Sequence, residues 1–456
     1  MILMQNTVNV IQLGIGFFLI FFAFNSQGFI EESVINSFAD KGEISKHAGY
    51  TSLAIIYAVF TLANFLAAPI VGFLGPKLSM FLAALTYGLF QVGFLFLNEV
   101  FLYLSSAAIG VGAAVIWTAQ GKYLSMNSSS ETSSKHSGIF WATSQCCILF
   151  GGVFLFVVFQ SSDKSDIDES TVKVLYGVFT VVTILGAGVL LLLRTKTNYG
   201  VVNTMTSNSE IAVTQTEIIL GAIKLMFTKK MGFLILAFAY TGVELSFWSG
   251  IYPTCISFTK KLGSNTHTLV AFNAMAQGVG QIIGGLLFGI FGSKTRRFNR
   301  QSKIFLGTVV HLICFILIFI NFPSDAPINK TDDTGLIYPN IYLALFSTIL
   351  LGFGDACWNT QIFAHLIDNY PTKSAEAFSN FKFYQSLLTC ACFFYSPYLQ
   401  LQWHILILMV LGVLGLVAFV YVDRMPLSDA LETSDSIDSK ENDENDVSLT
   451  DSPLND

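Results

Sequence analysis

Three charged side chains, Glu244, Asp355 and Lys382, lie inside long apolar stretches of this 456-residue sequence. A charge at the centre of a bilayer costs about 2.5–3.5 kcal/mol on insertion scales, so each is a candidate functional group. A carboxylate in such a place can bind a cation or a coupling proton. We expect the three to form a carboxylate–ammonium network along a path for a solute or for protons. The alternative is a static ion pair, or a Lys382 side chain that extends to the membrane surface.

A second candidate group is a repeated phrase with aromatic and amide side chains at matching positions. Each copy has two glycines, then a tryptophan, then a glutamine three residues after the tryptophan. The copies are Gly110, Gly112, Trp117 and Gln120, and Gly352, Gly354, Trp358 and Gln361. Aromatic faces and amides suit cations or small polar organic molecules, so the two tryptophans and two glutamines are candidates to line a central cavity. Helix packing is the alternative role.

A G-x-x-G-x-K stretch also occurs twice. The copies are Gly72, Gly75 and Lys77, and Gly289, Gly292 and Lys294, the second being followed by Arg296 and Arg297. A weaker third match pairs Trp141 and Gln145 with Phe381 and Gln385. The three matches follow the same order at offsets of about 217 to 242 residues, so they indicate an internal duplication.

Composition indicates where these residues lie. Hydrophobic residues make up 53% of the chain and charged residues 12%, and the apolar residues come in long blocks. About 20 apolar residues cross a bilayer as a helix, whereas a membrane β-barrel has alternating segments of about 10. The sequence therefore predicts an all-α membrane protein with twelve transmembrane helices. The predicted spans are roughly 8–30, 50–74, 78–98, 100–123, 138–160, 171–193, 231–256, 267–291, 304–322, 340–365, 376–399 and 401–422.

The longest polar interruption splits these spans six and six. We predict an N-terminal six-helix bundle at 1–193, a cytoplasmic linker at 194–230 and a C-terminal six-helix bundle at 231–424. Residues 425–456 hold ten acids and a single lysine, a charge of −9 against −6 for the whole chain. This segment has no aromatic residue and is rich in serine and asparagine, so we predict a disordered acidic tail.

The basic residues predict the orientation. With the N-terminus inside, the inside loops hold fifteen Lys and Arg residues and the outside loops seven. The positive-inside rule then places both termini in the cytoplasm. The sequon at Asn329 falls in an outside loop and is the predicted glycosylation site, whereas the sequon at Asn127 falls in an inside loop.

The chain resembles the Unc-93-like branch of the major facilitator superfamily. The stretches that carry the resemblance are GYTSLAIIYAVF (49–60), FLGPKLSMF (73–81), VIWTAQGKYL (115–124), SGIFWATSQ (137–145), AYTGVELSFWSGIYPTCI (239–256) and GFGDACWNTQ (352–361). The resemblance implies two six-helix bundles, a multi-pass membrane location and, for the G-x-x-G-x-K stretches, the superfamily's conformational loop motif. Both copies depart from that motif, with Pro76 and Ser293 where an Asp is expected. Members of this branch are described as transporters, ion-channel regulators or trafficking partners of receptors.

The remaining motifs exclude other classes of protein. The sequence contains no GxxxxGK[ST], G-x-S-x-G or HExxH stretch, and its seven cysteines form no CxxC pair. We therefore expect no enzyme activity, no cofactor, no metal site and no nucleic-acid partner. The expected function is secondary transport of a small solute, with the proton as a candidate coupling ion. The alternative is a membrane regulator or chaperone of another membrane protein, which keeps the fold without transporting.

Overall fold

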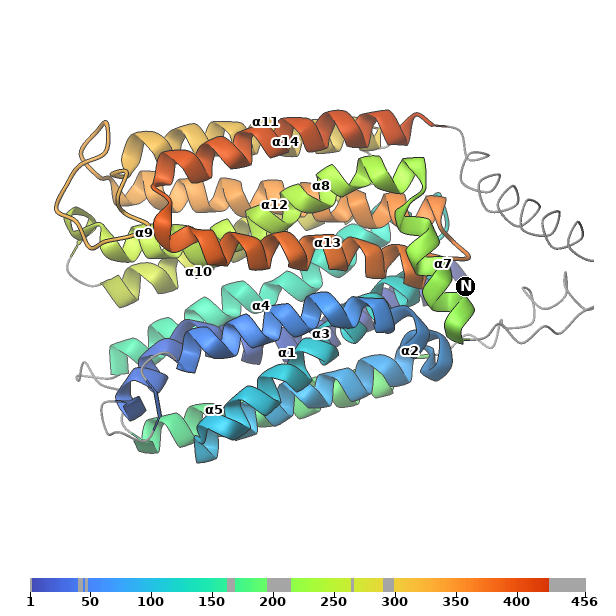
Figure 1. The fold of residues 1–456 in the computed structure, drawn as a ribbon, viewed down its shortest axis with the longest axis horizontal. Helices are drawn as coiled ribbons and strands as arrows, with labels where there is room; N and C mark the ends of the chain where they lie inside the picture. The colour runs from blue at the N-terminus through green and yellow to red at the C-terminus, as the bar shows by residue number, and fades with distance from the viewer. Residues whose placement is uncertain are drawn as a thin grey trace, which may run out of the picture.

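The computed structural model describes residues 2–39, 44–45, 48–161, 169–194, 215–263, 266–289 and 299–425, and long helices dominate it (Figure 1). The all-α prediction is confirmed. The helices are α1 (Ile2–Ala39), α2 (Ala48–Gly93), α3 (Glu99–Met126), α4 (Ser133–Ser161), α5 (Glu169–Leu191), α7 (Gln215–Met226), α8 (Lys229–Ser246), α9 (Tyr252–Phe258), α10 (Thr266–Gly289), α11 (Arg300–Asn321), α12 (Ile341–Asn369), α13 (Ser374–Tyr395) and α14 (Leu401–Asp423). A short π-helical segment, Phe247–Ile251, joins α8 to α9.

The long helix α2 contains two membrane passes that meet at Gly75. This glycine has φ 74° and ψ 158°, a backbone conformation that costs glycine little and other residues more. Gly110 of α3 packs against Ile56, and Gly112, half a turn further along α3, packs against Thr86. Because both parts of α2 lie beside the same turn of α3, the chain reverses direction at Gly75. The first G-x-x-G-x-K copy is therefore the turn between the second and third spans.

Ten helical stretches of the described residues are long and apolar enough to cross a membrane. The stretch Thr51–Phe96 is one of them and holds two passes. Helix α13 is not among the ten because it carries Glu376, Lys382 and many small polar residues, yet it packs between α2 and α8. Counting both, the chain has the twelve passes that the sequence predicts.

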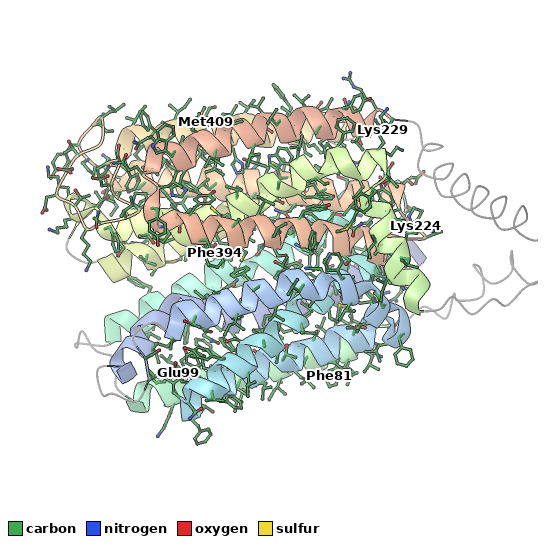
Figure 2. All side chains as sticks on the ribbon, in the orientation of Figure 1. Phe81, Glu99, Lys224, Lys229, Phe394 and Met409 are labelled. Atoms are coloured by element: carbon green, nitrogen blue, oxygen red, sulfur yellow. The ribbon has the colours of Figure 1, made fainter. Side chains whose placement is uncertain are left out.

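The charged and apolar surfaces are arranged as a bilayer requires. Phe394 and Met409 lie on the flank of the helical body, whereas Lys224 and Lys229 lie at one end and Glu99 at the opposite end (Figure 2). Phe394 is 68% exposed, and many other large apolar side chains are exposed along the same helices. A face of this kind is stable in contact with lipid rather than with water.

The helices form two groups that meet mainly through α4 and α10. In Figure 1, α1 to α5 lie in the lower group and α8 to α14 in the upper group. Gly285 packs against Ala142 and Gly278 against Leu149, so small residues bring the two backbones together. Helix α13 of the upper group also packs against α2 and α3 of the lower group.

The glycines of α10 pack against two neighbouring helices. A Cβ at Gly280 or Gly284 would meet α12, at Ile349 O in the first case, whereas one at Gly285 or Gly289 would meet α4. The GxxxG spacings 280/284 and 285/289 therefore pack against two different helices, α12 and α4. Because α10 contacts one helix of each group through these glycines, it holds the two groups together.

The predicted linker contains a helix that the sequence analysis did not predict. Helix α7 contacts both α2 and α13, and Asn380 Nδ2 donates a hydrogen bond to Ala222 O at 3.1 Å. It lies at the end of the molecule where the N-terminus lies (Figure 1). Residues 195–214 of the linker lie outside the described residues, as do residues 426–456 of the predicted tail. The bounds of the four predicted regions stay a prediction.

The two sequons differ in exposure. Asn329 is exposed and belongs to the loop between α11 and α12. That loop lies at the end of the molecule opposite the N-terminus (Figure 1). Asn127 is buried at the end of α3, where its Nδ2 donates to Tyr123 O and its Oδ1 accepts from Asn9 Nδ2 at 2.9 Å. An oligosaccharide needs an exposed asparagine, so the structure gives a physical reason to favour Asn329.

We expect N-glycosylation at Asn329 and none at Asn127. In mammalian cells, Asn329→Gln should remove the gel-mobility shift that an N-glycosidase removes from the parent protein. Asn127→Gln is the matched control and should keep that shift. A shift that survives Asn329→Gln and disappears with Asn127→Gln would overturn the predicted orientation.

Candidate central cavity

A cavity of about 180 Å³ lies between the two groups of helices and is lined by residues from both. Aromatic side chains are the largest group in its wall, among them Phe17, Phe21, Tyr57, Trp117, Trp141 and Trp248. The polar groups of the wall are fewer and include Asn25, Gln145, Asp355, Asn359, Lys382 and Gln385. An apolar pocket with a few convergent polar groups is the usual form of a binding site for a small molecule.

Asp355 lines this cavity from the middle of α12, and it is 4% exposed. Gln281 Nε2 of α10 donates to Asp355 Oδ2 at 2.5 Å, and Asn359 Nδ2 donates to Oδ1 at 2.7 Å. Gln281 Oε1 in turn accepts from Trp141 Nε1 at 2.6 Å. Both carboxyl oxygens therefore have donors, and the chain of hydrogen bonds runs from α12 through α10 to α4 of the other group.

Glu244 lies next to Asp355 but not in the cavity wall. The two carboxyls are within hydrogen-bonding reach of each other. On its other side, Glu244 Oε1 is 3.8 Å from His311 Nε2, which also contacts Leu351 O at 3.0 Å. Because that carbonyl can only accept, we assign the proton to Nε2, so that Nδ1 accepts from Tyr240 Oη at 2.5 Å. His311 is thus a buried histidine with a hydrogen bond at each ring nitrogen.

Lys382 reaches the cavity from α13, and its ammonium lies against aromatic rings. Its Nζ is 4.4 Å from the ring centroid of Trp117 and 4.6 Å from that of Phe381, and it donates to Gln385 Oε1 at 2.7 Å. No carboxylate among the described residues lies within 4 Å of it. The expected direct ion pair is therefore absent from this structure. The side chain is 4% exposed, so it does not extend to the membrane surface either.

The repeated tryptophan and glutamine residues have different places. Trp117 lines the cavity, but Trp358 does not, because its ring packs against Tyr240 at 4.8 Å within the second group. Gln120 and Gln361 are fully buried and do not line the cavity. The structure therefore does not place these two amides in the wall, where the sequence predicts them.

Several wall residues were absent from the sequence-based candidates. Trp141, Gln145 and Gln385 line the cavity, and Phe381 contacts the Lys382 ammonium. All four belong to the weaker third match of the internal repeat, which was the signal that could have identified them. Trp248 and Asn359 carried no such signal, because neither is at a matched position of the repeat.

Of the predicted loop motif, Gly72, Gly75 and Lys77 lie at the reversal of α2, and Gly289 ends α10 against α4. Gly292, Lys294, Arg296 and Arg297 lie outside the described residues. The conformational role of both copies stays a prediction.

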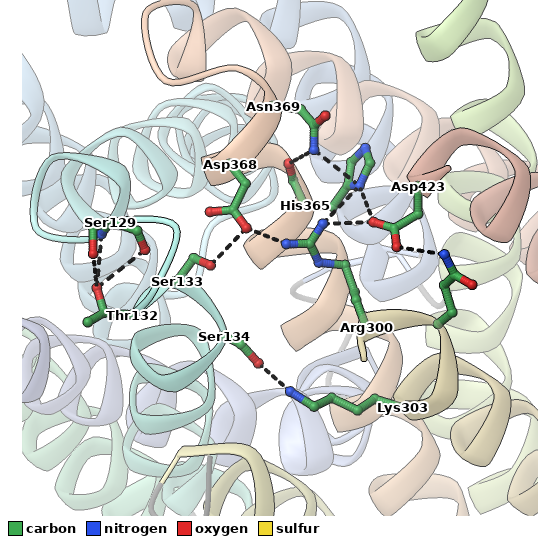
Figure 3. Close-up of polar contacts among 11 residues, drawn as sticks. Ser129, Thr132, Ser133, Ser134, Arg300, Lys303, His365, Asp368, Asn369 and Asp423 are labelled. Carbon is green, nitrogen blue, oxygen red and sulfur yellow. Dashed lines mark hydrogen bonds and ion pairs between the residues drawn. The ribbon is translucent and has the colours of Figure 1, made fainter. Parts of the chain in front are cut away.

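A second polar cluster lies at the predicted cytoplasmic end, around Arg300 at the start of α11. Its guanidinium contacts Asp368 of α12 and, at 2.8 Å, Asp423 of α14. His365 Nδ1 is 3.2 Å from Asp423 Oδ1 (Figure 3). No local sequence pattern identifies this cluster, because its residues come from three separate helices.

This cluster extends to the other group of helices. Ser133 Oγ of α4 donates to Asp368 Oδ2 at 3.0 Å. Lys303 Nζ donates to Ser134 Oγ at 2.8 Å (Figure 3). Two side-chain hydrogen bonds therefore join the groups at one end of the cavity.

Residues 40–420 match the model of a family described as ion channel regulatory protein UNC-93. The chain belongs to the UNC-93 family. It is 39% identical over 435 residues to the UNC93-like protein MFSD11 of Xenopus tropicalis, which covers 92% of this chain and 96% of that one. It is also 24% identical over 458 residues to protein unc-93 homolog A of Homo sapiens, covering 91% and 92%.

The fold of this UNC-93 family member is similar to that of a solved transporter. The TM-score is 0.67 to the structure described as a major facilitator superfamily transporter, FucP, in the outward conformation. The match covers 92% of this chain and 100% of that chain at 12% identity, so it concerns the fold alone. The predicted major facilitator fold and the multi-pass membrane location are confirmed.

Proposed function

We propose that this protein is a secondary transporter that moves a small solute by alternating access of its two groups of helices. The observation that carries the proposal is the cavity between the groups, with Asp355 and Lys382 both in its wall. Each charge costs free energy at this depth, so a bundle that served only as a scaffold would be more stable with apolar residues there.

The contacts around the cavity support a rocking motion. At the predicted cytoplasmic end, the hydrogen bonds from Ser133 to Asp368 and from Lys303 to Ser134 join the two groups. Such bonds form and break at low net cost, because water replaces the lost partner when the end opens. The cavity would then face alternate sides of the membrane.

Glu244 and Asp355 support the proton as coupling ion. Two ionised carboxyls in contact away from water repel each other strongly, and one shared proton removes the repulsion. Asp355 lies in the cavity wall and Glu244 lies behind it, so the protonation of the pair can respond to the solute. The proposal assigns no covalent chemistry to the protein and no enzyme activity.

The test is solute uptake into proteoliposomes with and without an imposed pH gradient. The panel contains organic cations, carboxylates, zwitterions and neutral sugars. We expect one class to accumulate only when the gradient is present, and to leak out when a protonophore is added. If no class crosses faster than in protein-free liposomes, with or without the gradient, transport is excluded for these solute classes.

A second candidate function is regulation or trafficking of another membrane protein, such as an ion channel or a receptor. The description of the UNC-93 family as an ion channel regulatory protein favours it. Co-expression with a candidate channel distinguishes the two functions: a regulator should change the channel's current or surface delivery, and Asp355→Asn should regulate as the parent does. A transporter should lose its activity with the same variant.

A further inference from the structure

The Lys382 ammonium can donate further hydrogen bonds to a molecule in the cavity. An ammonium has three N–H donors, and here one of them is taken by Gln385 Oε1. The rings of Trp117 and Phe381 lie on the ammonium, but a ring face is a weak acceptor. Lys382 is also the one cationic side chain among the described residues that line the cavity.

Asp355 lines the same cavity but is already engaged. Gln281 and Asn359 donate to its two oxygens, and Glu244 is within reach behind it. Among the described residues no ion pair within 4.0 Å joins it to Lys382 Nζ, although the two charges attract each other over a longer distance. The cavity therefore contains a buried cation without an anionic contact, which is the usual requirement for binding an anion.

The aromatic wall does not favour a cationic ligand. The sequence suggests cations for the faces of such rings, but the face of Trp117 is already covered by the protein's own ammonium. A second cation at that face would meet Lys382 and be repelled. The aromatic side chains on the α1 and α4 sides of the cavity remain as an apolar surface.

A second donor points to the same class of ligand. Trp248 lines the cavity, and its buried Nε1–H has no hydrogen-bond partner among the described residues. A buried indole N–H usually has an acceptor, so a ligand that brings oxygen acceptors would satisfy it.

We propose that the cavity binds a small monocarboxylate with a flat apolar body, its carboxylate on Lys382 Nζ and its body against the aromatic wall. This inference rests on the proposed transport function for its physiological meaning. A carboxylate that enters together with a proton on the Glu244–Asp355 pair adds no net charge to the cavity. The volume of about 180 Å³ restricts the ligand to a small molecule.

The test compares three probes of one shape and different charge: phenylacetate, phenylacetamide and phenylethylamine. Trp117, Trp141 and Trp248 line the cavity, so intrinsic fluorescence of the purified full-length protein reports binding. We expect phenylacetate to bind about 10- to 100-fold more tightly than phenylacetamide, because a hydrogen bond to a charged group is stronger than one between neutral groups. Phenylethylamine should bind most weakly.

Lys382→Met should reduce phenylacetate binding to the level of phenylacetamide and leave phenylacetamide binding nearly unchanged. Lys260→Met is the matched control. Lys260 is an exposed residue whose ammonium pairs with Asp332 at 2.7 Å, outside the cavity wall. Its substitution should therefore leave the binding of both probes unchanged. If Lys382→Met does not fold, the comparison of the three probes on the parent protein still tests whether the cavity prefers a carboxylate.

Equal binding of phenylacetate and phenylacetamide, or tighter binding of phenylethylamine, would overturn the inference. If the proteoliposomes transport another solute class and phenylacetate does not bind, the inference fails while the transport function stands. If phenylacetate binds with the expected preference and nothing in the panel is transported, the carboxylate site stands and the transport function fails.

Discussion

Replacing Asp355 with asparagine is expected to abolish solute accumulation driven by a pH gradient and to leave the protein folded. Asparagine keeps the shape of the side chain and removes the charge and the exchangeable carboxyl proton. One of the donors, Gln281 Nε2 or Asn359 Nδ2, would lose its acceptor, which costs about 1–3 kcal/mol for a buried group. That loss is small beside the packing of twelve helices, so surface delivery should persist.

The measurement is uptake into proteoliposomes across a range of pH, with protein recovery after size-exclusion chromatography as the test of folding. Asp332→Asn is the matched control: the same chemical change in the loop between α11 and α12, where Asp332 is 70% exposed. If Asp355→Asn transports like the parent at every pH, Asp355 is not the coupling site. Failure to fold would instead make Asp355 a structural residue.

The second large effect is expected from a single methyl group on α10. A Cβ at Gly280 would lie 2.1 Å from Ile349 O of α12, a backbone atom that cannot move away alone. Gly280→Ala must therefore separate α10 from α12, and overpacking of this kind costs about 1–3 kcal/mol. Because α10 also carries Gln281, the hydrogen bond to Asp355 should weaken with it.

Thermal unfolding of the purified protein measures this loss, and Gly280→Ala should lower the midpoint by several degrees. Gly177→Ala is the control, since no atom lies within 4 Å of a Cβ at this position of α5. There alanine should be neutral or stabilise by about 0.5–1 kcal/mol, as alanine has the higher helix propensity. Equal destabilisation by both variants would contradict the close-packing role of Gly280.

The positions of the helices were readable from local properties of the chain. Blocks of about 20 apolar residues predict membrane passes wherever they occur, because desolvation of the backbone forces a helix in lipid. The reversal at Gly75 fell where the sequence predicts a loop. Helix α7 was missed, since its apolar stretch is too short to cross a bilayer and lies within a longer polar interruption.

The internal repeat predicted packing better than it predicted function. Gly110 and Gly352 each pack closely against a backbone of a neighbouring helix. The two tryptophans that follow them separate, however: Trp117 faces the cavity and Trp358 packs on Tyr240. Equivalent positions in two halves meet different neighbours, so a repeated residue type does not specify a repeated role.

For the site, the sequence by itself determined that Asp355 and Lys382 are candidate functional groups. The free-energy penalty for an intramembrane charge depends only on the residue type and its depth in the bilayer. Only the tertiary structure decided what surrounds these two residues. Gln281 is 74 residues from Asp355 in the chain, and the Lys382 ammonium lies on Trp117 from the other half. Arg300 likewise meets Asp368 and Asp423 from two further helices. Such contacts arise from how the helices pack, and no local pattern encodes the packing of residues so far apart.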